Sequence, residues 1–315
     1  MGFPGSEYAG IRKKSDIFGG EDRAVELKTQ DKLTKSESAI EIQSYGQMIT
    51  RGFHVIGGNT KVLVGGTAKV VAMENAKVRA SGNACVQADG NVFVEASGSV
   101  TVVALGKSAI FAVGKVKVEA SGSATVLASG RSRVNACENA VIRVIEGARV
   151  TAKDNVRVTA SDKSFVVASG RASVTARGEA RVEVSDRAAV DAMGSCEVLG
   201  TDNATISADG RCVIEARDGV HVSARGTTEI YVKDSALVKA AGKVRVYAEA
   251  NSCVLAGEEA SIMAHGDAIV EANGASHVNA YDNTVVRAYE GAQIKLHGNA
   301  QKIDAFCDIL LPANA

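Results

Sequence analysis

Apolar and polar residues alternate within an eight-residue unit that repeats along most of this chain. From Thr60 to Asn299, Val or Ile recurs at every eighth position, beginning with Val62 and Val70 and ending with Ile294. These thirty octads follow one another without an insertion or a deletion. Self-similarity at a fixed short period indicates a solenoid, in which each repeat packs only against its neighbours.

The pattern inside each octad predicts a β-strand followed by a bend. Ala76, Val78 and Ala80 fall on one side of an extended chain, and Lys77 and Arg79 fall on the other. This period of two is the strand signature, and β-branched residues suit strands. The Gly and polar residues that close the octad suit a turn, so each octad predicts a five-residue strand and a three-residue bend.

The number of octads in one coil decides the shape of the solenoid. Residues that precede the central Val, sampled at every third octad from Lys69, are apolar at seven of ten positions, against one and three for the other two sets. Acidic bend residues share this spacing, and opposed Ala layers would underfill the ~10 Å gap between two flat sheets. We therefore predict an all-β, single-stranded, three-sided parallel β-helix (β-solenoid) with three octads, a 24-residue repeat, per coil and about ten coils. The general preference of parallel crossovers favours a right-handed coil.

The octads also divide the chain into segments. Residues 1–23 contain Gly, Pro and mixed charge without periodicity, which predicts a flexible N-terminal arm. We predict an N-terminal cap at 24–59, the solenoid at 60–299, and a C-terminal cap at 300–315, where bulky residues break the octad.

Composition narrows the classes of partner. Apolar residues make up 46% of the chain, aromatic residues only 4%, and Trp is absent, which predicts a narrow core of Ala, Val and Ile. Basic and acidic residues balance at 36 each, so there is no bulk electrostatic reason to expect a nucleic acid or an anionic membrane as a partner. The sequence shows no signal peptide and no run long enough to span a membrane. We expect a cytoplasmic or virion-associated protein.

The candidate chemical groups are scattered or have a structural explanation. The six cysteines lack short ligand spacing and are interpreted as small apolar fillers in a reducing compartment: Cys85, Cys137, Cys196, Cys212, Cys253 and Cys307. The histidines fall in different columns of the 24-residue repeat, with His265 and His297 on different corners. No two histidines are then stacked on successive coils.

Acidic residues at one predicted corner are the feature that most resembles a site. They are Glu138, Asp162, Asp186, Asp234, Glu258 and Asp282. Carboxylates stacked about 4.8 Å apart suit a hard cation such as Ca²⁺. A self-neutralising charge ladder is favoured instead, because Arg133, Arg157 and Arg181 occupy a neighbouring column. We therefore expect no catalytic residues, no cofactor, no metal and no small-molecule substrate, and not an enzyme.

One predicted face carries an outward apolar stripe. It consists of Phe93, Val141, Phe165, Val213, Leu237 and Val285. Charged residues flank it, and an apolar stripe with a charged rim is typical of a specific protein contact. The stripe predicts binding to another copy of the chain, giving a homo-oligomer, or to a structural protein partner.

The octads "ATVLASGR", "ARVTAKDN" and "ASVTARGE" resemble the octapeptide repeats of bacterial and bacteriophage parallel β-solenoid proteins. More loosely, the chain is similar to bactofilins, cytoskeletal solenoids that polymerise end to end, although bactofilin coils are shorter and enclose larger apolar residues. The resemblance implies a structural protein and supplies no catalytic residue. Two functions follow as expectations: a non-enzymatic rod that self-associates or scaffolds a larger assembly, or a binding and attachment module such as a phage tail or surface-appendage component.

Overall fold

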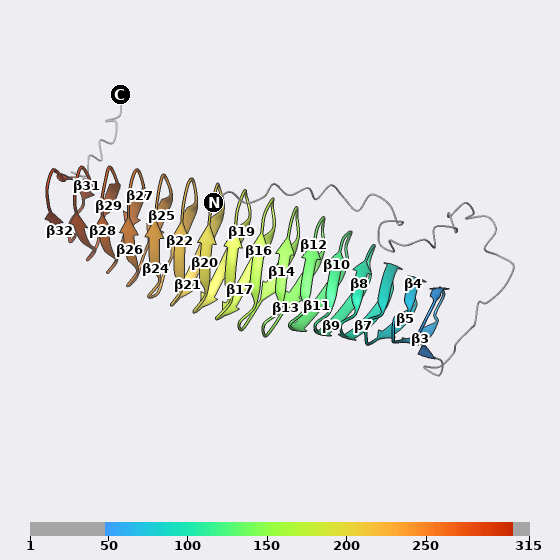
Figure 1. Cartoon of the computed structure of the whole chain (residues 1–315). Coiled ribbons are helices and arrows are strands. Elements are labelled where there is room, and N and C mark those ends of the chain that lie inside the picture. The colour runs from blue at the N-terminus through green and yellow to red at the C-terminus, as the bar shows by residue number, and fades with distance from the viewer. Residues whose placement is uncertain (1–47, 305–315) are drawn as a thin grey trace, which may run out of the picture. The chain divides into compact units, whose positions relative to one another are not determined.

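The computed structural model describes residues 48–304, which form a parallel β-solenoid of 33 strands, with no helix in this range (Figure 1). The odd-numbered strands form one sheet, sheet A, and the even-numbered strands form the other, sheet B. The strands of sheet A are β1 Met48–Ile49, β3 Lys61–Val64, β5 Lys77–Ala80, β7 Phe93–Gly98, β9 Ala109–Gly114, β11 Thr125–Gly130, β13 Val141–Val144, β15 Arg157–Ala160, β17 Ser173–Gly178, β19 Ala189–Gly194, β21 Thr205–Gly210, β23 His221–Ala224, β25 Leu237–Ala240, β27 Cys253–Ala256, β29 Ile269–Ala272, β31 Val285–Ala288 and β33 Gln301–Asp304. The strands of sheet B are β2 Phe53–Ile56, β4 Lys69–Glu74, β6 Cys85–Gly90, β8 Thr101–Ala104, β10 Lys117–Ala120, β12 Arg133–Ala136, β14 Arg149–Ala152, β16 Phe165–Ala168, β18 Arg181–Val184, β20 Glu197–Gly200, β22 Val213–Ala216, β24 Glu229–Val232, β26 Arg245–Ala248, β28 Ser261–Ala264, β30 His277–Ala280 and β32 Gln293–Leu296.

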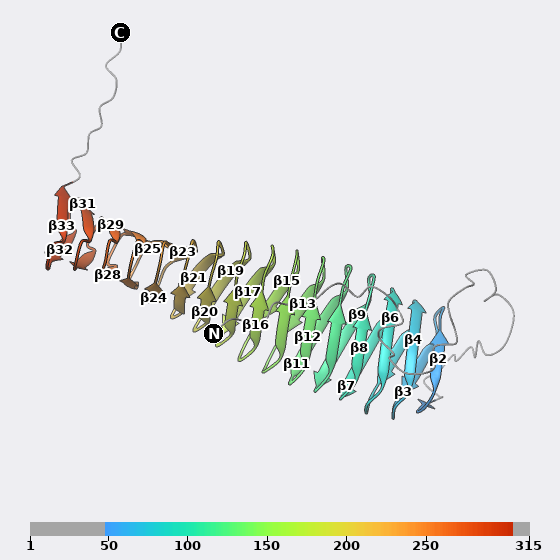
Figure 2. The same ribbon diagram turned by 45° about the horizontal axis from the view of Figure 1, so that its top comes forward.

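Each coil contains two octads, one on each sheet. Val158 of β15 pairs with Val174 of β17, and Val166 of β16 pairs with Val182 of β18, so partners along each sheet are two octads apart. The two sheets contain 17 and 16 strands, which gives sixteen two-strand coils and one further strand. At about 4.8 Å per coil, the stack is on the order of 75 Å long. Figure 2 shows the same succession of coils from a second direction.

The three-sided coil predicted from the sequence is therefore wrong, as are its three octads per coil and its total of ten coils. Because three octads are one and a half coils, residues sampled at every third octad alternate between the two sheets. Phe93 lies in sheet A, for example, and Lys117 lies in sheet B. The ~10 Å spacing used against two flat sheets belongs to sheets separated by larger side chains, and the gap narrows when Ala and Val fill it. The right-handed direction of the coil stays a prediction.

The core consists of the inward Ala and Val residues of both sheets, as the octad pattern predicts. Val78, Val166 and Val246 are at most 1% exposed, and Ala80, Ala168 and Ala248 are buried beside them. From β3 to β31, the strands contribute to a single continuous cluster along the solenoid. The buried side chains of one coil closely resemble those of the next, so the core is a stack of thin, nearly identical layers.

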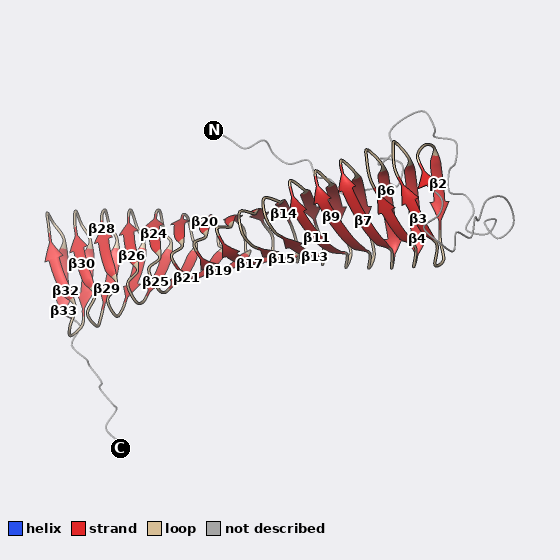
Figure 3. Ribbon diagram, turned by 90° about the horizontal axis from the view of Figure 1, so that it is seen from below, coloured by secondary structure: helices blue, strands red, loops and turns tan. Residues whose placement is uncertain are grey.

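Parallel pairing extends on both sides of the octads at 60–299. At the N-terminal end, β1 pairs with β3 and β2 pairs with β4, and at the C-terminal end β33 pairs with β31. Residues 1–47 and 305–315, which include the whole predicted N-terminal arm and parts of both predicted caps, lie outside the described residues. Along the stack the strands change direction gradually, which gives both sheets a twist (Figure 3).

Candidate interaction surfaces and side-chain clusters

The structure places the predicted apolar stripe on two opposite faces. Phe93, Val141, Leu237 and Val285 lie on sheet A, whereas Phe165 and Val213 lie on sheet B. All six side chains face outward, and Val141 and Val213 are 43% and 42% exposed. The six residues therefore do not form one surface. The four on sheet A are the ones that share a face.

Sheet A brings further apolar residues, which sampling at every third octad missed, next to Phe93. The rings of Phe93 and Phe111 lie 6.2 Å apart, centroid to centroid, in a tilted arrangement. Phe111 is 46% exposed and Val113 is 53% exposed. A shallow depression at this place is lined by Arg79, Glu95, Ala96, Ser97, Phe111 and Val113. Aligning the outward positions at every second octad would have found this cluster.

Charged side chains on sheet A are paired between successive coils. The Arg79 Nε donates a hydrogen bond of 2.7 Å to the Glu95 carboxylate, and the Arg287 Nη1 donates one of 3.0 Å to Glu271. In each pair the two residues occupy the same position of neighbouring strands. The exposed setting of such pairs limits their contribution to stability.

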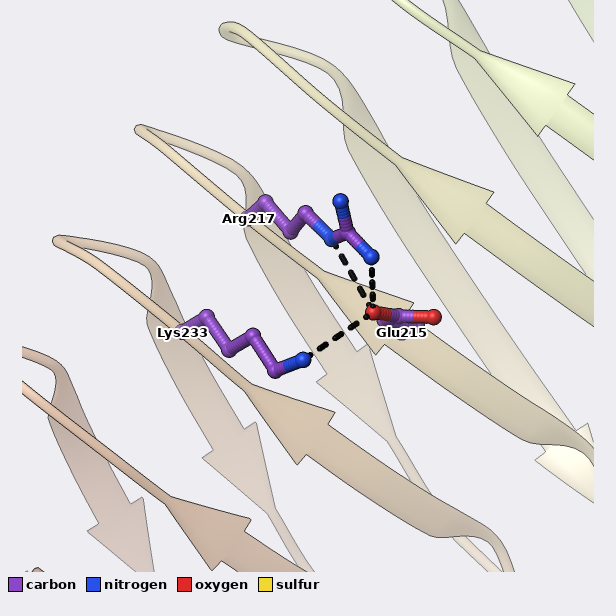
Figure 4. Close-up of polar contacts among 3 residues, drawn as sticks. All are labelled: Glu215, Arg217 and Lys233. Atoms are coloured by element: carbon purple, nitrogen blue, oxygen red, sulfur yellow. Dashed lines mark hydrogen bonds and ion pairs between the residues drawn. The ribbon is translucent and has the colours of Figure 1, made fainter. Parts of the chain in front are cut away.

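Sheet B carries a smaller aromatic cluster within a more charged surface. The rings of Tyr231 and Tyr247 stack with their centroids 5.0 Å apart, and the Tyr231 hydroxyl donates a hydrogen bond to Glu229. In the neighbouring coil, Glu215 accepts hydrogen bonds from Arg217 and also lies 3.5 Å from the Lys233 Nζ (Figure 4). The hydrogen bond from Arg217 lowers the pKa of the Glu215 carboxyl, and burial partly opposes that decrease. This cluster has the geometry of a surface ion-pair network.

The acidic bend residues lie on two corners and bind the backbone. Asp186 follows β18 and Asp162 follows β15, so they lie at opposite ends of the coil. Their φ angles are close to +60°, in the left-handed region that residues other than Gly, Asn and Asp rarely adopt. The N–H of Gly170, one coil earlier, donates a hydrogen bond of 2.9 Å to the Asp186 carboxylate. Gly122 donates in the same way to Glu138, and Gly266 to Asp282.

This arrangement corrects the single acidic corner inferred from the sequence. The residues expected in one ladder are divided between two corners, and Arg157 lies on sheet A while Arg133 and Arg181 lie on sheet B. The carboxylates of Glu138, Asp186 and Asp282 satisfy backbone N–H groups of the preceding coil. Within residues 48–304, no group of three or more His, Cys, Asp or Glu side chains is placed to hold a metal ion.

Two histidines stack on one corner, contrary to the expectation that they occupy different corners. The His265 and Tyr281 ring centroids are 4.5 Å apart, and so are those of Tyr281 and His297. The His265 Nδ1 also lies 3.4 Å from the Asp282 carboxylate. The three rings follow β28, β30 and β32 at one corner, so Tyr281 separates the two imidazoles.

The cysteines differ in their surroundings. Cys196 and Cys212 are buried in the core at the same position of adjacent coils, as small core residues. A hydrogen bond between the two thiols raises the pKa of Cys196, as does burial, and lowers the pKa of Cys212. Cys85, Cys137 and Cys253 are partly exposed, and burial raises the pKa of each thiol. Cys307 lies outside the described residues.

No helix in the described part of the chain is long and apolar enough to cross a membrane. Comparison with known proteins gave no match to a family model, to a curated protein or to a solved structure.

Proposed function

We propose that this protein is a non-enzymatic structural rod that self-associates or scaffolds a larger assembly. The observation that carries the proposal is the uninterrupted in-register stack of sixteen coils with exposed apolar side chains on its outer face. Backbone hydrogen bonds join each coil to the next, and the buried core is continuous along the solenoid. Each strand between the two ends is bonded to a neighbour on both sides, and a continuous stack of this kind suits a spacer or a scaffold.

The exposed apolar side chains supply the means of association. Phe111, Val141 and Ile269 are large apolar residues exposed on sheet A. Apolar groups clustered on one face are typical of protein contacts, because their burial against a partner removes them from water. Phe93, Val141, Leu237 and Val285 are therefore kept as contact residues in the proposal.

The test is the assembly state of the purified full chain across a wide concentration range. Analytical ultracentrifugation should show mass increasing with concentration, and electron micrographs should show rods associated with one another. A chain that stays monomeric at every concentration would overturn the proposed self-association. A single closed trimer would instead favour the attachment module.

A further inference from the structure

The outward residues of sheet A are distributed symmetrically about β19. Four strands on each side, β7 to β13 and β25 to β31, are rich in apolar residues, and the five strands between them, β15 to β23, are mostly polar. We call the first group the N patch and the second the C patch. The apolar outward residues of the N patch are Phe93, Ala109, Phe111, Val113, Leu127 and Val141, and those of the C patch are Leu237, Cys253, Leu255, Ile269 and Val285.

Several residues equally distant from β19 match in character. Phe93 of β7 corresponds to Val285 of β31, and Val141 of β13 corresponds to Leu237 of β25. Leu127 of β11 corresponds to Leu255 of β27. An isologous contact requires this kind of self-complementarity, because the same surface must serve both partners.

Two arrangements would bring sheet A of one copy against sheet A of another. If the twofold axis runs along the strands through β19, the rods are antiparallel and the N patch of one copy faces the C patch of the other. Each residue then faces the same position of the matching strand, so Phe93 meets Val285. If the axis runs along the rod, every strand faces its own equivalent in reverse direction.

The parallel arrangement would bury charges against apolar side chains. Val141 would face Arg143, and Ile269 would face Glu271, because each apolar residue lies two positions before a charge on its own strand. Three further strands would form the same mismatch, namely β7, β25 and β31. Burying a charge against an apolar side chain is costly, so this arrangement is disfavoured.

The antiparallel arrangement leaves a single mismatch of this kind. Phe111 would face Glu271, and Val113 would lie opposite the polar Asn273. Phe93, Ala109, Leu127 and Val141 face apolar residues of the C patch. Glu95 of one copy then faces Arg287 of the other, which is a complementary pair. Two like-charge contacts offset it: Arg143 lies opposite Lys239, and at the axis Asp191 of β19 lies opposite Asp191 of the other copy. The count of apolar and charged contacts therefore favours antiparallel rods.

We infer that two copies of this chain pack antiparallel through sheet A, with the twofold axis at β19. The inference rests on the proposed self-association and assigns it a surface and an orientation. Four strands about 4.8 Å apart and four residues long cover roughly 250 Å². Two patches on each of two copies bury on the order of 1,000 Å², which is about the smallest area expected of a biological interface. Because the sheets twist, the copies wind around one another to keep both patches in contact.

Sheet B lacks this distribution. At the outward position where sheet A carries Phe93, Val141 and Leu237, strands β10, β12, β14 and β18 of sheet B carry Lys117, Arg133, Arg149 and Arg181. A row of like charges opposes face-to-face packing of two copies. Exposed apolar residues on sheet B therefore provide a matched control.

The first experiment compares substitutions on the two faces. Val141→Lys with Ile269→Lys should weaken association at least tenfold, as measured by sedimentation equilibrium, because each Lys faces an apolar residue of the partner. Val213→Lys with Met263→Lys changes two comparably exposed residues of sheet B and should leave the association constant unchanged. Equal effects of the two pairs would overturn the inference. Circular dichroism should show the same β content in both variants.

The second experiment tests the orientation. In a chain that keeps Cys253 and has Cys85, Cys137 and Cys307 changed to Ser, Thr125→Cys places a second thiol opposite Cys253 of the other copy. A short bismaleimide should then link position 125 to position 253, identified by mass spectrometry. Within one chain these positions are eight coils apart, about 38 Å, which is beyond the reach of the reagent. Links from 125 to 125 would overturn the antiparallel arrangement.

The outcomes separate the inference from the proposed function. If the parent chain is monomeric, the proposed self-association fails, and the inference fails with it. If the parent associates but the sheet A substitutions have no larger effect than the sheet B control, association uses another surface. The proposed function then stands and the sheet A contact does not.

Discussion

At the residue scale, small polar side chains in the core differ in whether their hydroxyl groups have partners. The Ser276 hydroxyl is buried without a hydrogen-bond partner, whereas the Ser164 hydroxyl donates to the Ser161 carbonyl over 2.8 Å. Ser276→Ala should raise the free energy of unfolding by about 1 kcal/mol, because it removes an unsatisfied polar group. Ser164→Ala should lower it by a similar amount. Denaturant titration of both variants measures the free energy of unfolding. Changes of the same sign in the two variants would contradict the prediction.

Corner residues carry a second residue-scale prediction. Asp186 has a φ angle of 58° and its carboxylate accepts the Gly170 N–H. Asp186→Ala loses the hydrogen bond but keeps a Cβ in the left-handed region, which Asp tolerates better than Ala, so it should cost about 1–2 kcal/mol. Asp186→Gly loses the same hydrogen bond without the steric cost and should be less destabilising. A Gly variant that melts at a lower temperature than the Ala variant would show that the positive φ angle does not determine the stability of this corner.

At the element scale, the alternation inside one strand separates core from surface. Val166 is fully buried and Val167, the next residue of β16, is half-buried on the outer face. Val166→Asp should disrupt the local coils, because an unpaired charge in a dry core costs several kcal/mol. Val167→Asp should be tolerated, with a melting temperature close to that of the parent. Similar melting curves for the two variants would refute the inward assignment of the central Val.

The strand, its inward face and its bend could all be predicted from the octad, because each depends on residues within eight positions. The number of octads per coil could not. Side chains such as Val166 and Ala168 can fill either a flattened coil or a triangular one. Which coil forms depends on the angle of the bend and on how closely the sheets approach one another. The assumption of three octads per coil combined residues of two opposite faces into one predicted stripe. It also hid the fact that Phe93 and Phe111 are neighbours. It also hid the stacking of His265 on Tyr281, which an alignment at every second octad reveals.

At the scale of the whole molecule, a coil of two octads determines which distant residues become neighbours. Thr151 of β14 pairs with Val167 of β16 on sheet B, whereas Thr175, three octads after Thr151, lies on sheet A. We therefore predict that pyrene attached to cysteines at 151 and 167 gives excimer fluorescence, since neighbouring strands lie about 4.8 Å apart. Pyrene at 151 and 175 should give monomer emission, because the core separates the two faces. Both variants need Cys85, Cys137, Cys253 and Cys307 changed to Ser, and dilute samples exclude contacts between molecules. Excimer emission from the 151 and 175 pair but not from the 151 and 167 pair would indicate a coil of three octads. The antiparallel contact through sheet A would then be wrong as well, because the symmetry about β19 depends on the two-octad register.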